Sequence, residues 1–200
     1  MPDPIDFYFD FSSPYSYLAS EMIDELAAKY AREVSWRPIL LGAAFQKSGL
    51  PLLVTVPLKG EYSLRDFDRS ARFHNIPFKF PAKFPLATQS AARGYYWLQG
   101  QDFKKAREFA HAVFRAYWVD GRDVSALGVV QEIAAGLGID SAALTEAVAR
   151  PEVKDRLKSE TDGAIAKGMF GAPYIIVDGE PFWGADRLPQ LEKWLATGGF

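Results

Sequence analysis

The side chain best placed to do chemistry in this sequence is the hydroxyl of Ser13, because the hydrophobic period changes there. Apolar residues alternate along residues 5–11, as in a β-strand, and return at helical spacing after Pro14. Serine is favoured at a helix cap and proline at the first helical position. Ser13 is therefore expected where free backbone N–H groups and the helix dipole favour an anion. The alternative is that Ser13 only caps the helix.

Other reactive groups are few. The chain contains no cysteine, which excludes disulfides, protein thiolates and cysteine-based zinc sites. His74 and His111 lie far apart in the sequence without other residues at ligand spacing, so we expect no metal site. The charged run at residues 65–72 is interpreted as a solvated or ion-paired helix face. The aromatic residues 95–97 and 117–118 are interpreted as core, although one or two of them also suit the lining of an aromatic pocket.

The N-terminal elements position Ser13. We expect a strand over residues 5–11, a helix over residues 14–32 and a second strand over residues 34–41. A connection of this length implies a parallel strand pair with a right-handed crossover. Residues 42–60 contain several glycine and proline breakers, which predicts an irregular loop of the kind that often carries binding groups.

The remaining elements are helices and a hairpin. The spacing over residues 61–167 is helical almost throughout, with an extended crossing forced by prolines at residues 76–85. Two short apolar runs within residues 174–183 flank Asp178-Gly179, which predicts a hairpin with a type I′ turn. A helix closes the chain. The order β-α-β, helical insertion, β-β-α predicts an α/β, thioredoxin-like fold split by a large all-helical insertion.

Length and composition agree with this organisation. The 200 residues, 48% of them apolar, suffice for one sizeable core with an insertion. We expect residues 1–41 and 169–200 to form the thioredoxin-like domain, and residues 42–168 the binding loop and inserted helical domain. The net charge of -2 and the lack of a basic cluster argue against nucleic acid as a partner. No signal core or membrane-length apolar run is present, which predicts a cytoplasmic protein without a membrane partner.

Six motifs, spread over the whole chain, are the most specific feature of the sequence. They are Asp10-Phe11-Ser12-Ser13-Pro14-Tyr15-Ser16-Tyr17-Leu18-Ala19, Arg65-Asp66, Ile76-Pro77-Phe78, Phe84-Pro85, Phe170-Gly171-Ala172-Pro173 and Trp183-Gly184-Ala185-Asp186-Arg187-Leu188. Together they resemble the 2-hydroxychromene-2-carboxylate isomerase family, which is related to kappa-class glutathione transferases and DsbA-type oxidoreductases. The redox relatives open the first helix with Cys-x-x-Cys. This chain has serine at both cysteine positions, so disulfide exchange is lost.

The resemblance implies a glutathione site. Ser13 would be the catalytic residue and would hydrogen-bond the sulfur of glutathione, where a hydroxyl donor and the helix dipole favour a thiolate. The backbone of Ala172 would pair with the cofactor, and the bond to Pro173 would be cis. Asp186 would take the ammonium of the γ-glutamyl end, or else cap the last helix. The implied cofactor-binding residues are Ser13, Ala172, Pro173, Trp183, Gly184, Ala185 and Asp186.

The substrate side departs from the family pattern. The resemblance implies substrate-binding residues at Phe45, Gln46, Lys47 and Phe84. Relatives commonly have Phe-Lys-x-x-Gly-Asn where residues 45–50 stand, so here the lysine is displaced by one place and the asparagine is replaced by leucine. A lost amide or hydroxyl removes a hydrogen bond worth about 0.5–1.5 kcal/mol. The loop is therefore expected to bind a less polar ligand.

The expected function is a glutathione-dependent cis-trans isomerase of an aromatic 2-oxo acid, with glutathione as cofactor and a small aromatic molecule as substrate. Two alternatives stay open, namely a kappa-like glutathione transferase and a non-catalytic ligand-binding protein on the same fold. The related families are commonly dimers, so the resemblance also implies a homodimer.

Overall fold

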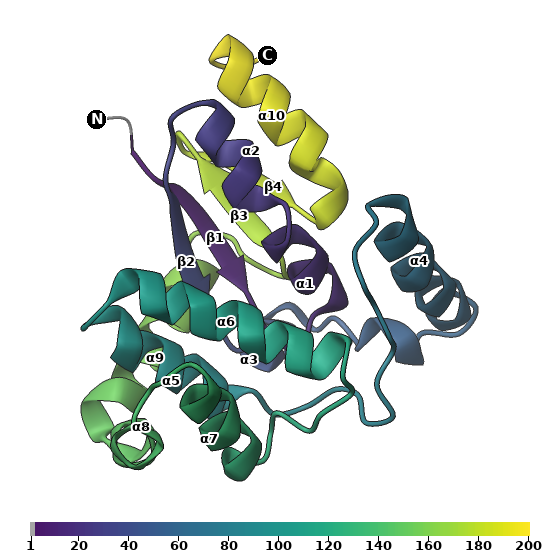
Figure 1. The fold of residues 1–200 in the computed structure, drawn as a ribbon. Helices are drawn as coiled ribbons and strands as arrows, with labels where there is room; N and C mark the ends of the chain where they lie inside the picture. The colour runs from purple at the N-terminus through teal and green to yellow at the C-terminus, as the bar shows by residue number, and fades with distance from the viewer. Residues whose placement is uncertain (1–2) are drawn as a thin grey trace.

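A four-stranded mixed sheet brings the two ends of the chain together (Figure 1). In the computed structural model, which describes residues 3–200, β1 (Ile5–Phe9) is parallel to β2 (Val34–Pro38) and antiparallel to β3 (Tyr174–Val177). β3 pairs antiparallel with β4 (Glu180–Trp183), which gives the order β2-β1-β3-β4. The parallel pair and the C-terminal hairpin agree with the sequence prediction.

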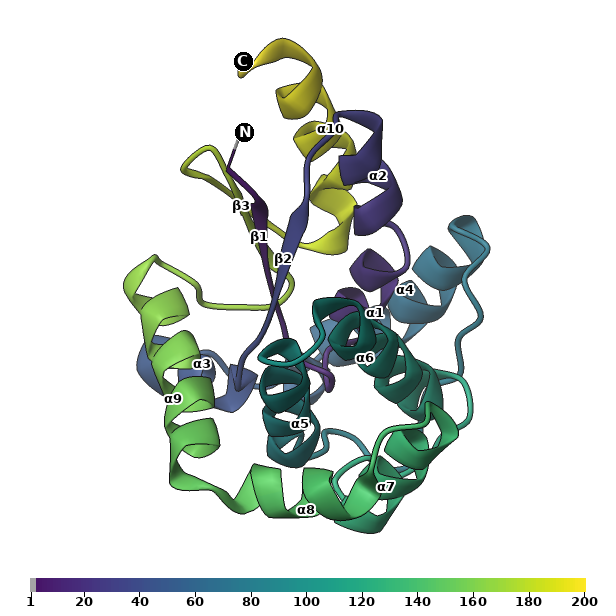
Figure 2. The same cartoon turned by 60° about the vertical axis from the view of Figure 1, so that its left-hand side comes forward.

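Helices cover both faces of this sheet. Within the described residues they are α1 (Pro14–Ser20), α2 (Ile23–Lys29), α3 (Leu41–Ser48), α4 (Lys59–Phe73), α5 (Gln89–Gln99), α6 (Phe103–Trp118), α7 (Leu127–Gly136), α8 (Ser141–Ala149), α9 (Pro151–Ala166) and α10 (Leu188–Thr197), with short 3-10 helices η1 (Leu53–Thr55) and η2 (Ala185–Arg187). Figure 2 shows α2 and α10 on one side of the sheet and α9 on the other. None of these helices is both long enough and apolar enough to cross a membrane.

Successive side chains of β1 point to opposite faces of the sheet, and each face has its own layer of buried residues. The ring of Phe9 lies 5.3 Å from the rings of both Trp36 in β2 and Phe114 in α6. On the opposite face, Tyr8 packs in a second cluster with Ala164 of α9 and Ala172. Helices of the insertion therefore pack directly on the sheet, on both faces.

The hairpin turn has the predicted geometry. Asp178 and Gly179 both have positive φ, of 52° and 86°, as a type I′ turn requires. This turn matches the right-handed twist of the flanking strands, so β4 returns alongside β3 and leads the chain into η2.

The prediction of one helix over residues 14–32 is wrong, because the segment is two helices that meet at Glu21 and Met22. The hydroxyl of Ser20 donates to the carbonyl of Tyr17 at 2.7 Å. A serine that bonds back to the preceding turn weakens and bends a helix. Glu21 then turns toward α6, where Arg115 donates to its carboxylate at 2.7 Å.

The prediction of an irregular loop over residues 42–60 is also wrong, because α3 occupies its first half. β2 ends at Pro38, earlier than expected, and Gly49 closes α3 with φ 70°. A glycine in this left-handed conformation is a helix terminator, and the sequence analysis took it as a loop breaker. Leu40 supplies no side-chain cap to the start of α3, so no local signal marked it.

The helical character of residues 61–167 is confirmed by α4 to α9, and so is the extended crossing between α4 and α5. The crossing segment (residues 76–86) is held by hydroxyl groups. Tyr17 donates to the carbonyl of Pro77 at 2.7 Å, and Tyr117 donates to the carbonyl of Lys83 at 2.9 Å. The crossing segment is therefore fixed to both α1 and α6.

The division into residues 1–41 with 169–200 and residues 42–168 stays a prediction. Its residues 1–2 lie outside the described part of the chain. One core cluster contains Phe7 and Trp36 from the sheet together with Phe109 and Val113 from the insertion, so both parts share buried surface.

Candidate active site

The first turn of α1 meets the loop before β3 at Ser13. The side chain of Ser13 is almost fully buried and caps α1, accepting from the backbone N–H of Ser16 at 3.1 Å. The Ser13 hydroxyl also donates to the carbonyl of Ala172 at 2.9 Å. The two stretches that the sequence analysis singled out thus touch through one hydroxyl, although 159 positions separate them.

The loop that follows this contact is fixed by backbone geometry. The Ala172–Pro173 peptide bond is cis, as the resemblance implied. The carbonyl of Pro173 accepts from the N–H of Gly184 at 3.0 Å. At Gly184, where φ is 109°, an added Cβ would lie 2.4 Å from a carboxylate oxygen of Asp186. Only glycine therefore leaves room for the observed position of that carboxylate.

The indole of Trp183 covers the loop. An added Cβ on Gly171 would lie 2.5 Å from its Nε1, and its ring lies 4.7 Å from that of Phe170. Ala185 is buried, and η2 contacts α1. The structure thus brings together all of the residues expected at the cofactor, which are Ser13, Ala172, Pro173, Trp183, Gly184, Ala185 and Asp186.

The carboxylate of Asp186 faces solvent. Its side chain is 72% exposed and lies 3.4 Å from Arg187. The alternative interpretation, in which Asp186 caps the last helix, is wrong, because one 3-10 turn intervenes and α10 begins at Leu188. The carboxylate is therefore available to a ligand.

Tyr15 links this site to α4. Its hydroxyl donates to Asp66 at 2.5 Å. Burial raises the pKa of Tyr15 far above its usual value, and the hydrogen bond to Asp66 and the charges of Asp66 and Asp186 raise it further. The interpretation of residues 65–72 as an ion-paired face is confirmed for Asp66 with Arg69, but Asp66 also holds α4 against the first turn of α1.

Asp10 is a buried residue of the site that the sequence analysis named only as the first residue of a motif, without a role of its own. Its side chain accepts three hydrogen bonds, from the backbone of Ser12, the backbone of Leu41 and the hydroxyl of Thr88, each at 2.8 Å. Burial raises the pKa of Asp10, and these three bonds offset part of that rise. The one local signal is its place two residues before Ser12, where an aspartate forms an Asx-turn.

The residues expected at the substrate lie on two other elements. Phe45, Gln46 and Lys47 lie on α3, the first half-buried and the other two exposed, and they take no part in the hydrogen bonds of Ser13. Their neighbour Ala44 packs in the same cluster as Ala172. α3 therefore adjoins the site through Ala44.

Phe84 lies on the crossing segment. It is half-buried, and its ring is 5.1 Å from Phe80 and 6.0 Å from Trp118. Two residues later, the N–H of Leu86 donates to the hydroxyl oxygen of Ser12 at 3.1 Å. Phe84 is thus part of an aromatic cluster whose segment is bonded to the residue beside Ser13.

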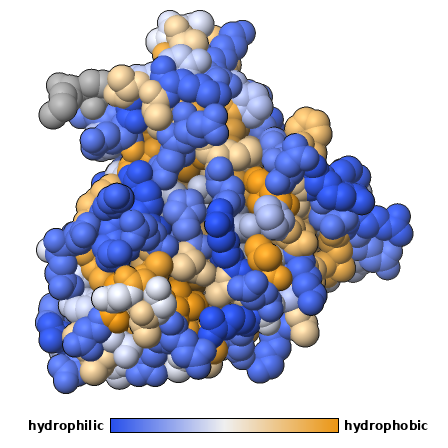
Figure 3. Space-filling model, viewed as in Figure 1, coloured by the Kyte–Doolittle hydropathy of each residue, from blue (hydrophilic) through white to orange (hydrophobic). Residues whose placement is uncertain are grey.

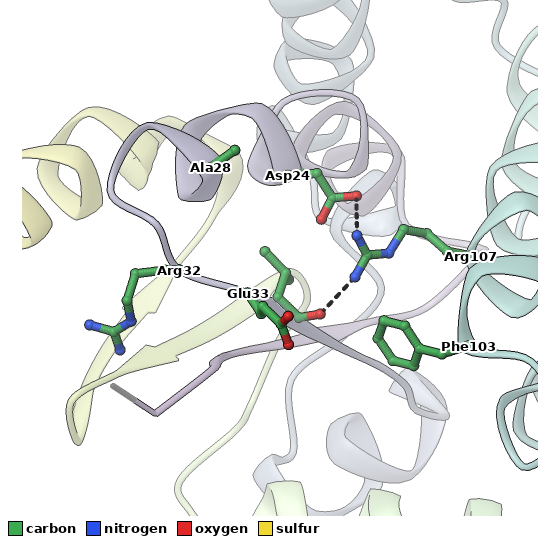
Figure 4. A pocket seen from close by; sticks show the side chains of 7 residues that line it. Asp24, Ala28, Arg32, Glu33, Phe103 and Arg107 are labelled. Carbon is green, nitrogen blue, oxygen red and sulfur yellow. Dashed lines mark hydrogen bonds and ion pairs between the residues drawn. The ribbon is translucent and has the colours of Figure 1, made fainter. Parts of the chain in front are cut away.

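Two cavities lie away from the hydroxyl of Ser13. One, of about 320 Å³, lies between α2, β2 and α6 and is lined by Asp24, Ala28, Arg32, Glu33, Val34, Phe103 and Arg107 (Figure 4). Arg107 crosses it to bond the Val34 carbonyl at 3.0 Å and Asp24 at 3.3 Å. The other, of about 330 Å³, is lined by Glu180, Pro181, Phe182, Trp183, Arg187, Gln190, Trp194 and Phe200. Only the second adjoins the loop at Gly184, because it shares Trp183 and Arg187 with it.

The chain is similar to known proteins over nearly its whole length. Residues 4–196 match the family described as the DsbA-like thioredoxin domain. The chain is 34% identical to 2-hydroxychromene-2-carboxylate isomerase of Sphingobium xenophagum over 98% of this chain and 99% of that protein. It is 30% identical to glutathione S-transferase kappa 2 of Caenorhabditis elegans over 96% and 91% of the two chains. A solved 2-hydroxychromene-2-carboxylate isomerase superimposes with a TM-score of 0.87 at 29% identity, covering 97% of this chain and 95% of that chain. The thioredoxin-like fold with its helical insertion is thereby confirmed, and the chain belongs to the 2-hydroxychromene-2-carboxylate isomerase family.

Proposed function

We propose that this protein is a glutathione-dependent isomerase of an aromatic, conjugated 2-oxo acid or its cyclic hemiketal. The observation that carries the proposal is the 2.9 Å hydrogen bond between the hydroxyl of Ser13 and the carbonyl of Ala172. It joins the one candidate sulfur-binding hydroxyl to the backbone expected to pair with glutathione. Relatives named as isomerases and as kappa-class glutathione transferases support an enzyme of this kind.

Three features of the chain fit glutathione. The Ser13 hydroxyl hydrogen is free to rotate from the Ala172 carbonyl toward a bound sulfur. The space beside Gly184, which any Cβ would fill, lets Asp186 offer a carboxylate to an ammonium group. The Ser16 hydroxyl, one turn after Ser13, is buried and bonds to no other group of the described residues.

Each part of the site has a chemical task. Glutathione, when bound, supplies the thiol that a chain without cysteine lacks, and its reversible addition to a conjugated double bond permits rotation about that bond. Ser13 donates a hydrogen bond that favours the anionic sulfur. Asp186 and the backbone of Ala172 hold the peptide part. Phe45, Gln46, Lys47 and Phe84 would orient the aromatic substrate, and such orientation lowers the entropic part of the barrier.

Calorimetric titration of glutathione and S-methylglutathione at neutral pH tests the proposal. We expect the wild-type protein to prefer the free thiol. Ser13→Ala should lose that preference and at least about tenfold in affinity, since a hydrogen bond to a charged group is worth about 1.5–3 kcal/mol. Turnover with glutathione should fall equally.

Ser20→Ala is the matched control, because it also removes a buried hydroxyl from α1, one that donates to the carbonyl of Tyr17 and not to the site of Ser13. Unchanged turnover in Ser13→Ala would rule out the role of Ser13. Failure of the wild-type protein to bind either ligand would favour a ligand-binding protein without glutathione.

A kappa-like transferase is the second candidate, and the 30% identity to glutathione S-transferase kappa 2 favours it. The two activities differ in what becomes of the cofactor. An isomerase returns glutathione unchanged, whereas a transferase consumes it in a conjugate, so the products separate them. The expectations of a homodimer and of a cytoplasmic location accompany both candidates.

A further inference from the structure

Asp10 joins three separate segments around the Ser13 corner. Its side chain is 5% exposed, and its partners Ser12 and Thr88 are buried as well. One oxygen accepts from the N–H of Ser12 and the hydroxyl of Thr88, and the other accepts from the N–H of Leu41. These donors belong to the turn before α1, the residue before α5 and the first residue of α3.

The bond to Leu41 replaces a helix cap. The residue before α3, Leu40, has no side chain that can accept a hydrogen bond, and its own N–H donates to the hydroxyl of Thr161 at 3.2 Å. A carboxylate is the favoured partner of the first N–H groups of a helix. Asp10, 31 positions earlier in the chain, takes that place for α3.

We propose that Asp10 is a positioning residue that fixes α3, and with it Phe45, Gln46 and Lys47, relative to Ser13. The inference rests on the proposed function, in which the cofactor lies at Ser13 and the substrate on the side of α3. The carboxylate bonds Ser12, which directly precedes Ser13, with one oxygen and the start of α3 with the other. Without this carboxylate, α1 and α3 would both still form, but the position of α3 relative to Ser13 would no longer be fixed.

Asp10→Asn tests this with almost no change of shape. An amide has one acceptor oxygen and one NH₂ group. In either orientation the NH₂ group faces a backbone N–H, of Ser12 or of Leu41, so one of the two bonds is lost. Thr88→Val is the matched control, because it removes the third bond to the same carboxylate and leaves both backbone bonds intact.

The assay is conversion of 2-hydroxychromene-2-carboxylate in the presence of glutathione, with amide hydrogen exchange of residues 40–48 as a second readout. We expect Asp10→Asn to lower kcat at least tenfold, to change the Kd for glutathione less than threefold, and to speed exchange at residues 40–48. Thr88→Val should keep kcat within threefold. Equal losses of kcat in both variants, or a parallel loss of glutathione binding in Asp10→Asn, would overturn the proposal.

A second variant covers the possibility that Asp10→Asn does not fold. Leu41→Pro removes the same N–H at the first helical position, where proline is tolerated, and Leu40 already has the extended backbone that a following proline requires. It should reproduce the fall in kcat. If the wild-type protein itself does not convert the substrate, the proposed function fails. In that event unchanged exchange at residues 40–48 in Asp10→Asn overturns the inference, and faster exchange there supports it.

Discussion

At Gly184, a backbone conformation controls where a functional side chain lies. Its φ of 109° and ψ of 151° belong to a region that other residues reach only at a cost of about 1–3 kcal/mol. Gly184→Ala would also push the Asp186 carboxylate, which lies 2.4 Å from the position of the new Cβ, away from its place. We expect glutathione affinity to fall at least about tenfold, as for a lost charged hydrogen bond. Calorimetric titration measures it.

Gly198→Ala is the control for backbone strain alone. Gly198 also has positive φ, of 74°, but it ends α10 and no atom lies within 4 Å of an added Cβ. Its alanine variant should lose stability and keep its glutathione affinity. Equal affinities of Gly184→Ala and wild type would show that Asp186 does not hold the cofactor.

Part of the site could be predicted from the sequence, because the position of some of its residues depends only on their neighbours in the chain. Ser13 stands between a strand period and a helix period, so its capping position could be predicted from sequence alone and is confirmed. Asp10 alternates with buried aromatic residues, as a polar strand residue does, and its partners Leu41 and Thr88 are 31 and 78 positions away. No local pattern carries such contacts.

The same distinction holds for secondary-structure elements. α8 could be predicted to begin after Asp140, which bonds the N–H groups of Ala142 and Ala143 and so carries its own start signal. The start of α3 could not be predicted in this way, because its first N–H, that of Leu41, donates to Asp10, which is distant in the sequence. The break between α1 and α2 was missed because one of its two causes, Glu21 turning toward α6, is a tertiary contact, and the other, the bond from Ser20 to the Tyr17 carbonyl, is one that a serine inside a helix does not always make.

Glu21, at the break between α1 and α2, is expected to make the stability of the fold depend on pH. Burial alone would raise the pKa of Glu21, but hydrogen bonds from His111 and Arg115 outweigh burial and lower it to about 2. A pKa lower in the folded state stabilises the fold above the unfolded value of 4.5, and this stabilisation is lost as the pH falls toward 2. Glu21→Gln should therefore cost about 3 kcal/mol at pH 7, and the difference from wild type should vanish near pH 2.

Urea unfolding of both proteins across this pH range measures the difference. Glu192→Gln is the matched control, because Glu192 forms an exposed ion pair with Lys29 at 3.5 Å. Exposed pairs contribute about 0–1 kcal/mol. A pH-independent difference between wild type and Glu21→Gln would refute the assigned charge interaction.

At the scale of the whole molecule, one continuous core joins the two parts into which the sequence analysis divided the chain. The order of elements could be predicted because each strand and most helices carry their own periodicity. How tightly the insertion packs on the sheet could not, because it depends on contacts such as those of Phe114 with Phe9 and Phe11, at 5.3 and 4.9 Å between ring centroids. α4 lies at the edge of the molecule, where Ala71 joins the core cluster and apolar side chains are at the surface beside it (Figures 1 and 3).

The shared core leads us to expect that the sheet and the insertion unfold as one cooperative unit. Phe114→Ala removes a fully buried ring between them and should cost about 3–5 kcal/mol. Amide exchange in β1 and in α8 should then accelerate by the same factor, because both open through the same global transition. Phe73→Ala is the control, since that ring is 79% exposed and its loss should change neither rate. Faster exchange in α8 with unchanged exchange in β1 would mean that residues 42–168 unfold independently, as a separate domain would.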